Sequence, residues 1–133
     1  MNFLLDTCTI SDFFKNISSV VIHYKSVSPE NIFISSVTVM EIEFGLKLNQ
    51  DRAKKIQPIW KEFLKHIHII PYTPQCAVFS ATIRAQLKAK GLLIGPYDIL
   101  LAGTALAHEM TLVTSNTDEF IRIPNLCLEN WRN

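Results

Sequence analysis

The sequence predicts an α/β fold in which a central, mostly parallel sheet of four to five strands is flanked by helices. Short apolar runs alternate with helical stretches along the chain, which is the pattern of parallel strands joined by helical crossovers. The 133 residues are 48% hydrophobic and have a mean hydropathy of +0.18, enough for one domain-sized core. Only four glycines are present and no repeats are visible, so we expect short loops and a single domain over residues 1–133.

Strands are expected where short runs of apolar residues are bounded by turn formers. The first run directly follows the N-terminus, and the second lies between the turn-forming residues 29–31 and 35–36. The expected strands are 2–5, 32–34, 67–70, 111–114 and, as a possible fifth, 126–128.

The intervening stretches have helical patterns. Thr73-Pro74 is a good helix opening, and Gly91 stands where a helix commonly ends. Pro58 is expected to start or kink its helix. The expected helices are 9–16, 18–27, 37–48, 52–66, 74–90 and 97–108. The helix at 37–48 should carry an apolar side made of Val37, Met40, Phe44 and Leu48.

Charge and cysteine content limit the class of protein. The formal net charge is +1, so charge alone argues neither for nor against a nucleic-acid partner. Some basic residues could contact phosphates or simply be solvated on helix faces: Lys47, Arg52, Arg84, Lys88 and Lys90. Cys8, Cys76 and Cys127 are odd in number and form no Cys-x-x-Cys pair, which is typical of free thiols in a reducing cytosol. No signal peptide or membrane span is visible, so we expect a cytoplasmic protein without membrane contact.

Asp6 ends the apolar run of the first strand and is the most informative residue of the chain. Ligands of open α/β sheets bind at the carboxyl ends of the strands, so an acid here either belongs to a site or caps the next helix.

Glu41 lies four residues after Val37 and three before Phe44, so helical spacing places it on an apolar face. A lone charge on such a face is costly unless it is paired or ligated. The alternative is a capping box, because residues 38–41 follow the Ser/Thr-x-x-Glu pattern.

Asp98 starts a helix and faces the small-residue stripe of Leu101, Ala102 and Ala105. Its alternative role is to complement the helix dipole in the first turn. The segment 114–120 follows the last clear strand, as Asp6 follows the first, and supplies further polar candidates. Each of these taken alone also fits a polar turn.

Three acids that meet in one pocket would repel one another, and a hard divalent cation would offset that repulsion. Mg²⁺ and Mn²⁺ prefer oxygen ligands, activate water and stabilise charge on a phosphodiester. No His/Cys set has the spacing of a zinc site, and no glycine-rich phosphate loop or nucleophile elbow is present.

Five segments together resemble the PIN-domain ribonucleases, specifically the VapC toxins of bacterial type II toxin–antitoxin pairs. They follow one another over essentially the whole chain: Leu-Leu-Asp-Thr at 4–7, Ile-Ser-Ser-Val-Thr-Val-Met-Glu-Ile-Glu-Phe-Gly at 34–45, Ile-Gly-Pro-Tyr-Asp at 94–98, Leu-Val-Thr-Ser-Asn-Thr-Asp-Glu-Phe at 112–120 and Ile-Pro-Asn-Leu-Cys-Leu-Glu-Asn-Trp at 123–131.

The resemblance implies a PIN-like three-layer fold and an Mg²⁺-dependent endoribonuclease, with Mn²⁺ as a possible substitute. Asp6, Glu41 and Asp98 match the family's acidic cluster, with Asp6 and Asp98 as metal ligands. Asn116 takes the slot of a fourth acid, and Asp118 or Glu119 is the alternative for that position.

Two further features of the family concern the pocket wall and the partners. Thr114 matches a threonine that lines the pocket, whereas Cys8 departs from the asparagine that is common in relatives. The implied partners are an RNA substrate, a VapB-like antitoxin that blocks the pocket, and a second copy of the chain in a homodimer.

Two other functions are compatible with acids at strand ends. A non-catalytic interaction module with a degenerate acidic pocket is one, and Cys8 and Asn116 are its best support. A phosphotransfer domain is the other, but it would need a paired acid beside the first strand, where Thr7-Cys8 stands instead.

Overall fold

The computed structural model describes all residues from 1 to 133. Its centre is a five-stranded sheet in which every neighbouring pair is parallel, in the order β3-β2-β1-β4-β5. The strands are β1 (Phe3–Leu5), β2 (Ile32–Ser35), β3 (His68–Ile70), β4 (Thr111–Val113) and β5 (Leu128–Glu129). The expected α/β class with a parallel sheet is therefore confirmed.

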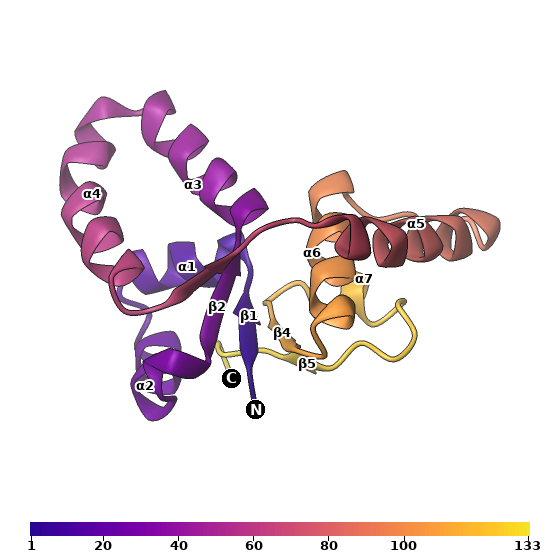
Figure 1. The fold of residues 1–133 in the computed structure, drawn as a ribbon. Coiled ribbons are helices and arrows are strands. Elements are labelled where there is room, and N and C mark those ends of the chain that lie inside the picture. The colour runs from indigo at the N-terminus through magenta and orange to yellow at the C-terminus, as the bar shows by residue number, and fades with distance from the viewer.

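Helices connect the strands and cover both faces of the sheet (Figure 1). They are α1 (Thr7–Phe14), α2 (Ser18–Ser26), α3 (Ser36–Leu48), α4 (Gln50–Leu64), α5 (Pro74–Ala89), α6 (Pro96–Ala107) and α7 (Thr117–Phe120), with a 3-10 turn, η1, at Pro29–Asn31. The short α7 occupies the segment that the sequence also allowed as a polar turn. None of these helices has the combination of length and apolar character that a membrane span requires.

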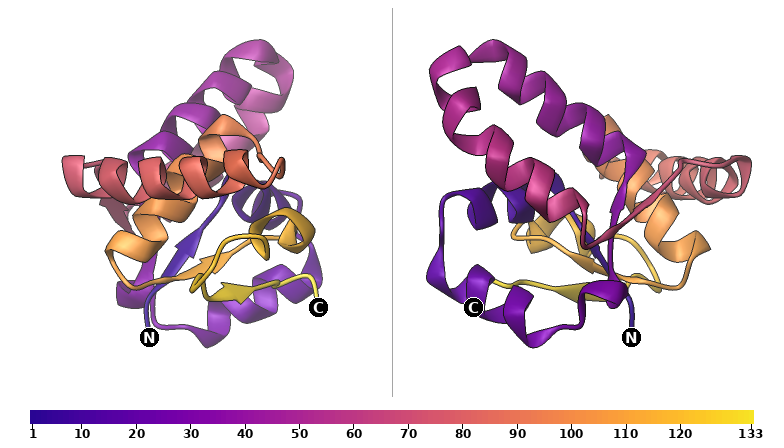
Figure 2. Two further views of the ribbon diagram at one scale, coloured as in Figure 1. Left: turned by 90° about the vertical axis from the view of Figure 1, so that its right-hand side faces the viewer. Right: turned by 60° about the vertical axis from the view of Figure 1, so that its left-hand side comes forward.

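The strands divide the core into two halves, because successive side chains of a strand point to opposite faces. Phe3 and Leu5 join one cluster with the helices α1 to α4, whereas Leu4 joins the other with α5, α6 and α7. In β4, Val113 belongs to the first of these clusters and Leu112 to the second. The result is a three-layer arrangement, and Figure 2 shows the two groups of helices on either side of the strands.

Helix boundaries depend on caps that the sequence supplies. Thr73 caps α5 through its hydroxyl, and Gly91 follows the helix with a φ of +68°, as expected. Pro58 lies inside α4, which begins eight residues earlier after the cap Asn49. The expectation that Pro58 would start the helix was therefore wrong.

The strand order places a topological switch point beside β1. The chain moves from β1 outward to β2 and β3, and then returns to the other side of β1 to form β4 and β5. Leu5 pairs with Val113, so the residues that follow β1 and β4 leave the sheet side by side. In open parallel sheets this is where ligands bind.

Candidate active site

Asp6 lies buried at the carboxyl end of β1 and caps α1. Its Oδ1 accepts a hydrogen bond from the backbone N–H of Thr9 at 2.8 Å. Its own N–H donates to the carbonyl of Val113 at 3.1 Å. The cap role is thus real, but the cap contact engages only one of the two carboxylate oxygens. α1 begins at Thr7, two residues before the expected start, because Asp6 itself is the cap.

Thr114 follows β4 and lies beside Asp6. Its side chain is fully buried, and hydrogen bonding to its hydroxyl lowers the pKa of the Asp6 carboxyl. Its Oγ1 also accepts from the backbone N–H of Asn116 at 3.0 Å. These contacts hold the segment after β4 next to the end of β1.

Glu41 of α3 faces the same region and is bound by α1. The hydroxyl of Thr7 donates to Glu41 Oε1 at 2.8 Å, across 34 residues of sequence. The capping box is excluded, because Ser35 caps α3 by accepting from the N–H of Val37 at 3.0 Å. Glu41 therefore accepts a hydrogen bond from a different helix and does not cap α3.

The apolar side that the sequence assigned to α3 is largely exposed, which corrects the expectation. The exposed fractions of Met40, Phe44 and Leu48 are 43%, 59% and 70%. The helix instead buries Thr38, Ile42 and Leu46. This helix carries two apolar stripes, and periodicity alone does not tell which one faces the sheet. Glu43, the second acid of α3, accepts a 2.6 Å hydrogen bond from the indole of Trp60.

Asp98 opens α6, and its electrostatic neighbours define the pocket. Burial, as the largest cause, and the charges of Asp6, Glu119 and Glu41 together raise the pKa of Asp98 from 3.8 to about 6. Burial likewise raises the pKa of Asp6, although hydrogen bonds from Thr114 and Thr9 partly offset the effect. The structure thus places Asp6 and Glu41 close enough to Asp98 for their charges to disfavour its ionisation.

Two of the three candidates for the fourth residue of the site are half-buried. Glu119 of α7 is half-buried and raises the pKa of Asp98, whereas Asp118 is exposed. Asn116 precedes α7 and is half-buried, and its side chain makes no capping hydrogen bond. Of the two half-buried candidates, Glu119 is the one whose charge acts on Asp98.

Asp12 and Arg132 are residues that sequence reasoning missed. Asp12 lies on α1, is only 3% exposed, and accepts two hydrogen bonds from the Arg132 guanidinium at 2.6 and 2.9 Å. Its charge also raises the pKa of Asp6. The partners are 120 residues apart, so no local pattern could have revealed the pair.

The donor chemistry of the pocket suits a hard cation. As placed, the side chains include no group of three or more His, Cys, Asp or Glu residues with the geometry of a metal site. The available donors are nevertheless carboxylate oxygens, and those near Asp98 disfavour its ionised form. Mg²⁺ and Mn²⁺ prefer such oxygens and need only a few of them, because they retain water ligands.

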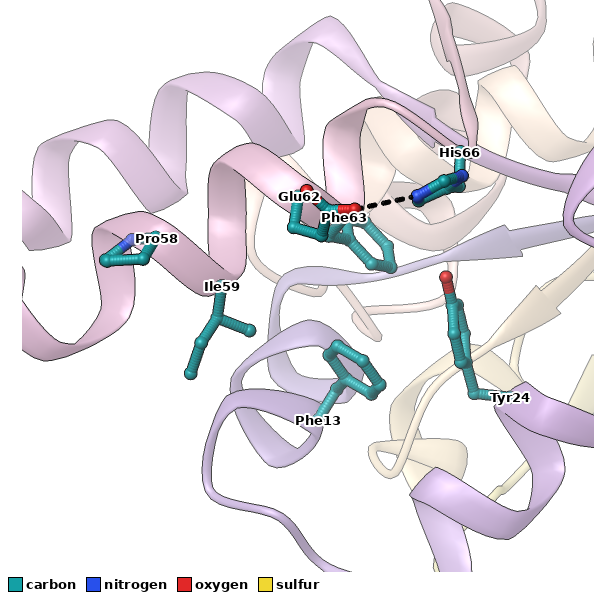
Figure 3. Close-up of a pocket in the computed structure, with 7 residues that line it drawn as sticks. All are labelled: Phe13, Tyr24, Pro58, Ile59, Glu62, Phe63 and His66. Atoms are coloured by element: carbon teal, nitrogen blue, oxygen red, sulfur yellow. Dashed lines mark hydrogen bonds and ion pairs between the residues drawn. The ribbon is translucent and has the colours of Figure 1, made fainter.

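A separate apolar groove lies between α1, α2 and α4 and includes none of these acids. Its volume is about 500 Å³. Figure 3 shows Phe13, Tyr24, Phe63 and Ile59 around it, with Glu62 and His66 joined by a hydrogen bond at its edge. The ring centroids of Phe13 and Tyr24 are 4.6 Å apart, so the walls are largely aromatic.

The chain belongs to the PIN domain family, which matches residues 3–126. Within that family it is a nuclease of the VapC type, and nucleases of this kind are hydrolases.

Two relatives illustrate this likeness. The chain is 40% identical over 100 residues to Ribonuclease VapC2 of Rickettsia felis, which covers 75% of this chain and 74% of the relative. It is 31% identical over 131 residues to the tRNA(fMet)-specific endonuclease VapC of Salmonella typhimurium, with 98% of each chain covered.

Solved structures agree with this assignment. The VapBC2 complex of Rickettsia felis, bound to a DNA fragment from its promoter, contains a chain that matches with a TM-score of 0.90 and 34% identity, over 98% of this chain and 99% of that one. A chain of FitAcB from Neisseria gonorrhoeae matches with a TM-score of 0.87 and 28% identity, over 97% of each chain.

Proposed function

We propose that residues 1–133 act as a single PIN-type domain that hydrolyses phosphodiester bonds in RNA, as the toxin of a VapBC-type pair in the cytoplasm. The observation that carries the proposal is the group of acids at the switch point of the sheet. There the charges of Asp6, Glu41 and Glu119 raise the pKa of Asp98, and the four residues come from four separate segments of the chain.

Asp6 and Asp98 are the proposed Mg²⁺ ligands, with Mn²⁺ as a substitute. When bound, the cation supplies an activated water and stabilises negative charge on the phosphodiester. Glu41 is fixed by Thr7 and orients the water that attacks phosphorus. Asn116 presents an amide that can hold the same water or a phosphate oxygen, and Glu119 increases the negative charge that attracts a cation.

The test is RNA cleavage with matched variants. Purified protein should cut RNA with Mg²⁺ or Mn²⁺, and EDTA should stop it. Asp6→Ala and Asp98→Ala should lower the rate by at least about 100-fold, the scale of a lost catalytic group. Because the Salmonella relative is named for tRNA(fMet), initiator tRNA is the first substrate to assay.

The alternative of a non-catalytic module predicts a different result. Intact RNA after prolonged incubation of the folded protein with Mn²⁺ would favour it. Cleavage that survives both substitutions and EDTA would instead contradict the proposed site.

The aromatic groove of Figure 3 is the proposed antitoxin site. The structural relatives include toxin–antitoxin complexes. An amphipathic helix can bury its apolar face in a groove of this kind. Ile59 is 41% exposed at its wall, so Ile59→Arg should abolish co-purification with the antitoxin while RNA cleavage persists.

The exposed stripe Met40, Phe44 and Leu48 on α3 is the proposed homodimer face. Exposed apolar surface of this extent is typical of interaction sites. Phe44→Asp should shift the protein from dimer to monomer in analytical ultracentrifugation, and an unchanged dimer would place the interface elsewhere.

A further inference from the structure

A second groove, with a volume of about 670 Å³, lies between α5 and the start of α6. Small side chains that are exposed on α5, at Ala77, Ala81 and Ala85, form part of its lining and leave it open. Its volume lies within the range of about 300–1,000 Å³ that is usual for small-ligand sites. The groove is therefore large enough for a nucleotide of a longer chain.

Nine of the 13 residues that line the groove are hydrophobic, and the lining includes two cations and two tyrosines. Arg84 and Lys88 lie one helical turn apart on α5, and Tyr72 and Tyr97 supply aromatic rings. No acidic residue lines the groove. Neither cation forms an ion pair within the chain, whose salt bridges involve only Lys65, His66 and Arg132 as cations. Two unpaired cations beside aromatic rings match a ligand with phosphates and bases.

Two residues of the groove, Tyr97 and Tyr72, lie near the acidic residues in the fold. Tyr97 directly precedes Asp98 in the first turn of α6, and consecutive helical residues point about 100° apart, so the two side chains serve neighbouring surfaces. The backbone N–H of Tyr72 donates to the hydroxyl of Ser36 at 3.1 Å. Ser36 follows β2, so Tyr72 lies at the same edge of the sheet as Asp6.

We propose that this groove binds the RNA strand next to the scissile phosphodiester, an inference that rests on the proposed function. Arg84 and Lys88 contact two backbone phosphates, and one base stacks on Tyr97. The acidic pocket itself repels a polyanion, so the affinity for RNA must come from cations outside it. A protein segment is the less suitable occupant, because it would need acidic residues to match the two cations.

The test separates binding from cleavage. Every protein carries Asp98→Asn, which blocks cleavage, and binding of a labelled single-stranded RNA is measured by fluorescence anisotropy. The double variant Arg84→Gln/Lys88→Gln should bind roughly ten-fold more weakly at physiological salt. The slope of log K against log salt should fall by about 1.4, the value for two phosphate contacts with a single strand. The matched control is Lys54→Gln/Lys55→Gln, which removes the same charge from the exposed surface of α4 and should retain the parent slope.

Stacking has its own pair of variants. Tyr97→Ala should weaken binding roughly ten-fold, whereas Tyr97→Phe should bind like the parent because the ring is kept. Circular dichroism and the thermal midpoint exclude misfolding as the cause.

The outcomes are distinct for the two proposals. If the wild type cleaves RNA but the groove variants bind like their parent, the groove is not the subsite and the nuclease stands. If the variants bind RNA normally but lose the homodimer or the antitoxin, the groove is a protein interface and this inference is overturned. If the wild type neither binds nor cleaves RNA, the proposed function fails first.

Discussion

At the scale of single residues, the Asp98 carboxyl combines burial with the negative charges around it. Its pKa of about 6 lies above the ordinary value of 3.8. Between these two pH values the folded state binds more protons than the unfolded state, so the free energy of unfolding falls as the pH rises through that window. At neutral pH the ionised Asp98 therefore destabilises the metal-free fold.

The substitution Asp98→Asn should remove this destabilisation, because asparagine carries no charge. In EDTA at pH 8, we expect the free energy of unfolding to rise by about 1 kcal/mol, a value reduced from the full shift because the group is half-exposed. At about pH 3, below the ordinary value of 3.8, the carboxyl is mostly neutral in both the folded and the unfolded state, so the difference should nearly disappear. Urea titrations at both pH values measure it, with the exposed Asp118→Asn as the control. An Asp98→Asn protein that is less stable than the parent at pH 8 would contradict the repulsive pocket.

The acidic residues show which parts of the site can be predicted from the sequence. Asp6 and Asp98 could be singled out because a strand end and a helix start are readable locally. The contacts of the neighbouring acids are not readable in this way: Thr7 donates to Glu41 across 34 residues, and Arg132 donates to Asp12 across 120. Such pairs depend on how the elements pack, and a single sequence contains no pattern that specifies this.

At the scale of elements, α5 and α6 approach so closely that one position excludes a side chain. A Cβ at Gly103 would collide with the Ser80 hydroxyl and come within 2.8 Å of the Ser80 backbone nitrogen and 2.9 Å of the Cys76 carbonyl oxygen. The Ser80 hydroxyl also donates to the carbonyl of Ile99 at 3.1 Å. Since α6 carries Asp98, this contact supports the geometry of the pocket.

Gly103→Ala should therefore destabilise the fold by about 1–3 kcal/mol, as overpacking does. Gly45→Ala is the control, because a Cβ at that helical glycine meets no atom within 4 Å. It should be neutral or stabilise the protein by up to about 1 kcal/mol. Thermal unfolding of both variants measures the contrast, and equal effects would mean that α5 separates easily from α6.

Element boundaries were mostly predictable, whereas element faces were not. The predicted ends of α5 and α6 are within one residue of the structure, because Thr73, Pro74, Pro96 and Gly91 are strong local signals. The buried face of α3 was wrong, since apolar residues lie on two sides of that helix. Hydrophobic periodicity identifies a helix, but partners elsewhere in the chain decide which side is covered.

At the scale of the whole molecule, the C-terminal residues fasten the last segment to the first two helices. The Trp131 ring is 2% exposed and stacks on His23, with ring centroids 5.6 Å apart. Its indole N–H donates to Glu129 at 3.0 Å, and Arg132 pairs with Asp12. The tail thus joins β5 to α1, the helix that Asp6 caps.

Arg132→Ala should destabilise the protein by about 1–3 kcal/mol, because the nearly buried Asp12 carboxylate loses its partner. Asp12→Asn in addition should recover part of the loss, since it removes the uncompensated charge. Chemical unfolding of the two single variants and the double variant gives the coupling energy. If the free-energy changes of the two single variants add up to that of the double variant, the interaction between Asp12 and Arg132 does not contribute to stability.

The strand order also has a consequence for synthesis of the protein. β1 is made first, but its neighbour β4 begins only at Thr111, and the tail that fastens α1 is translated last. A nascent chain that stalls before β4 lacks Thr114, Asn116 and Glu119, so its half-built pocket has no second wall. The residues of the proposed site therefore come together only after β4 and α7 have been synthesised.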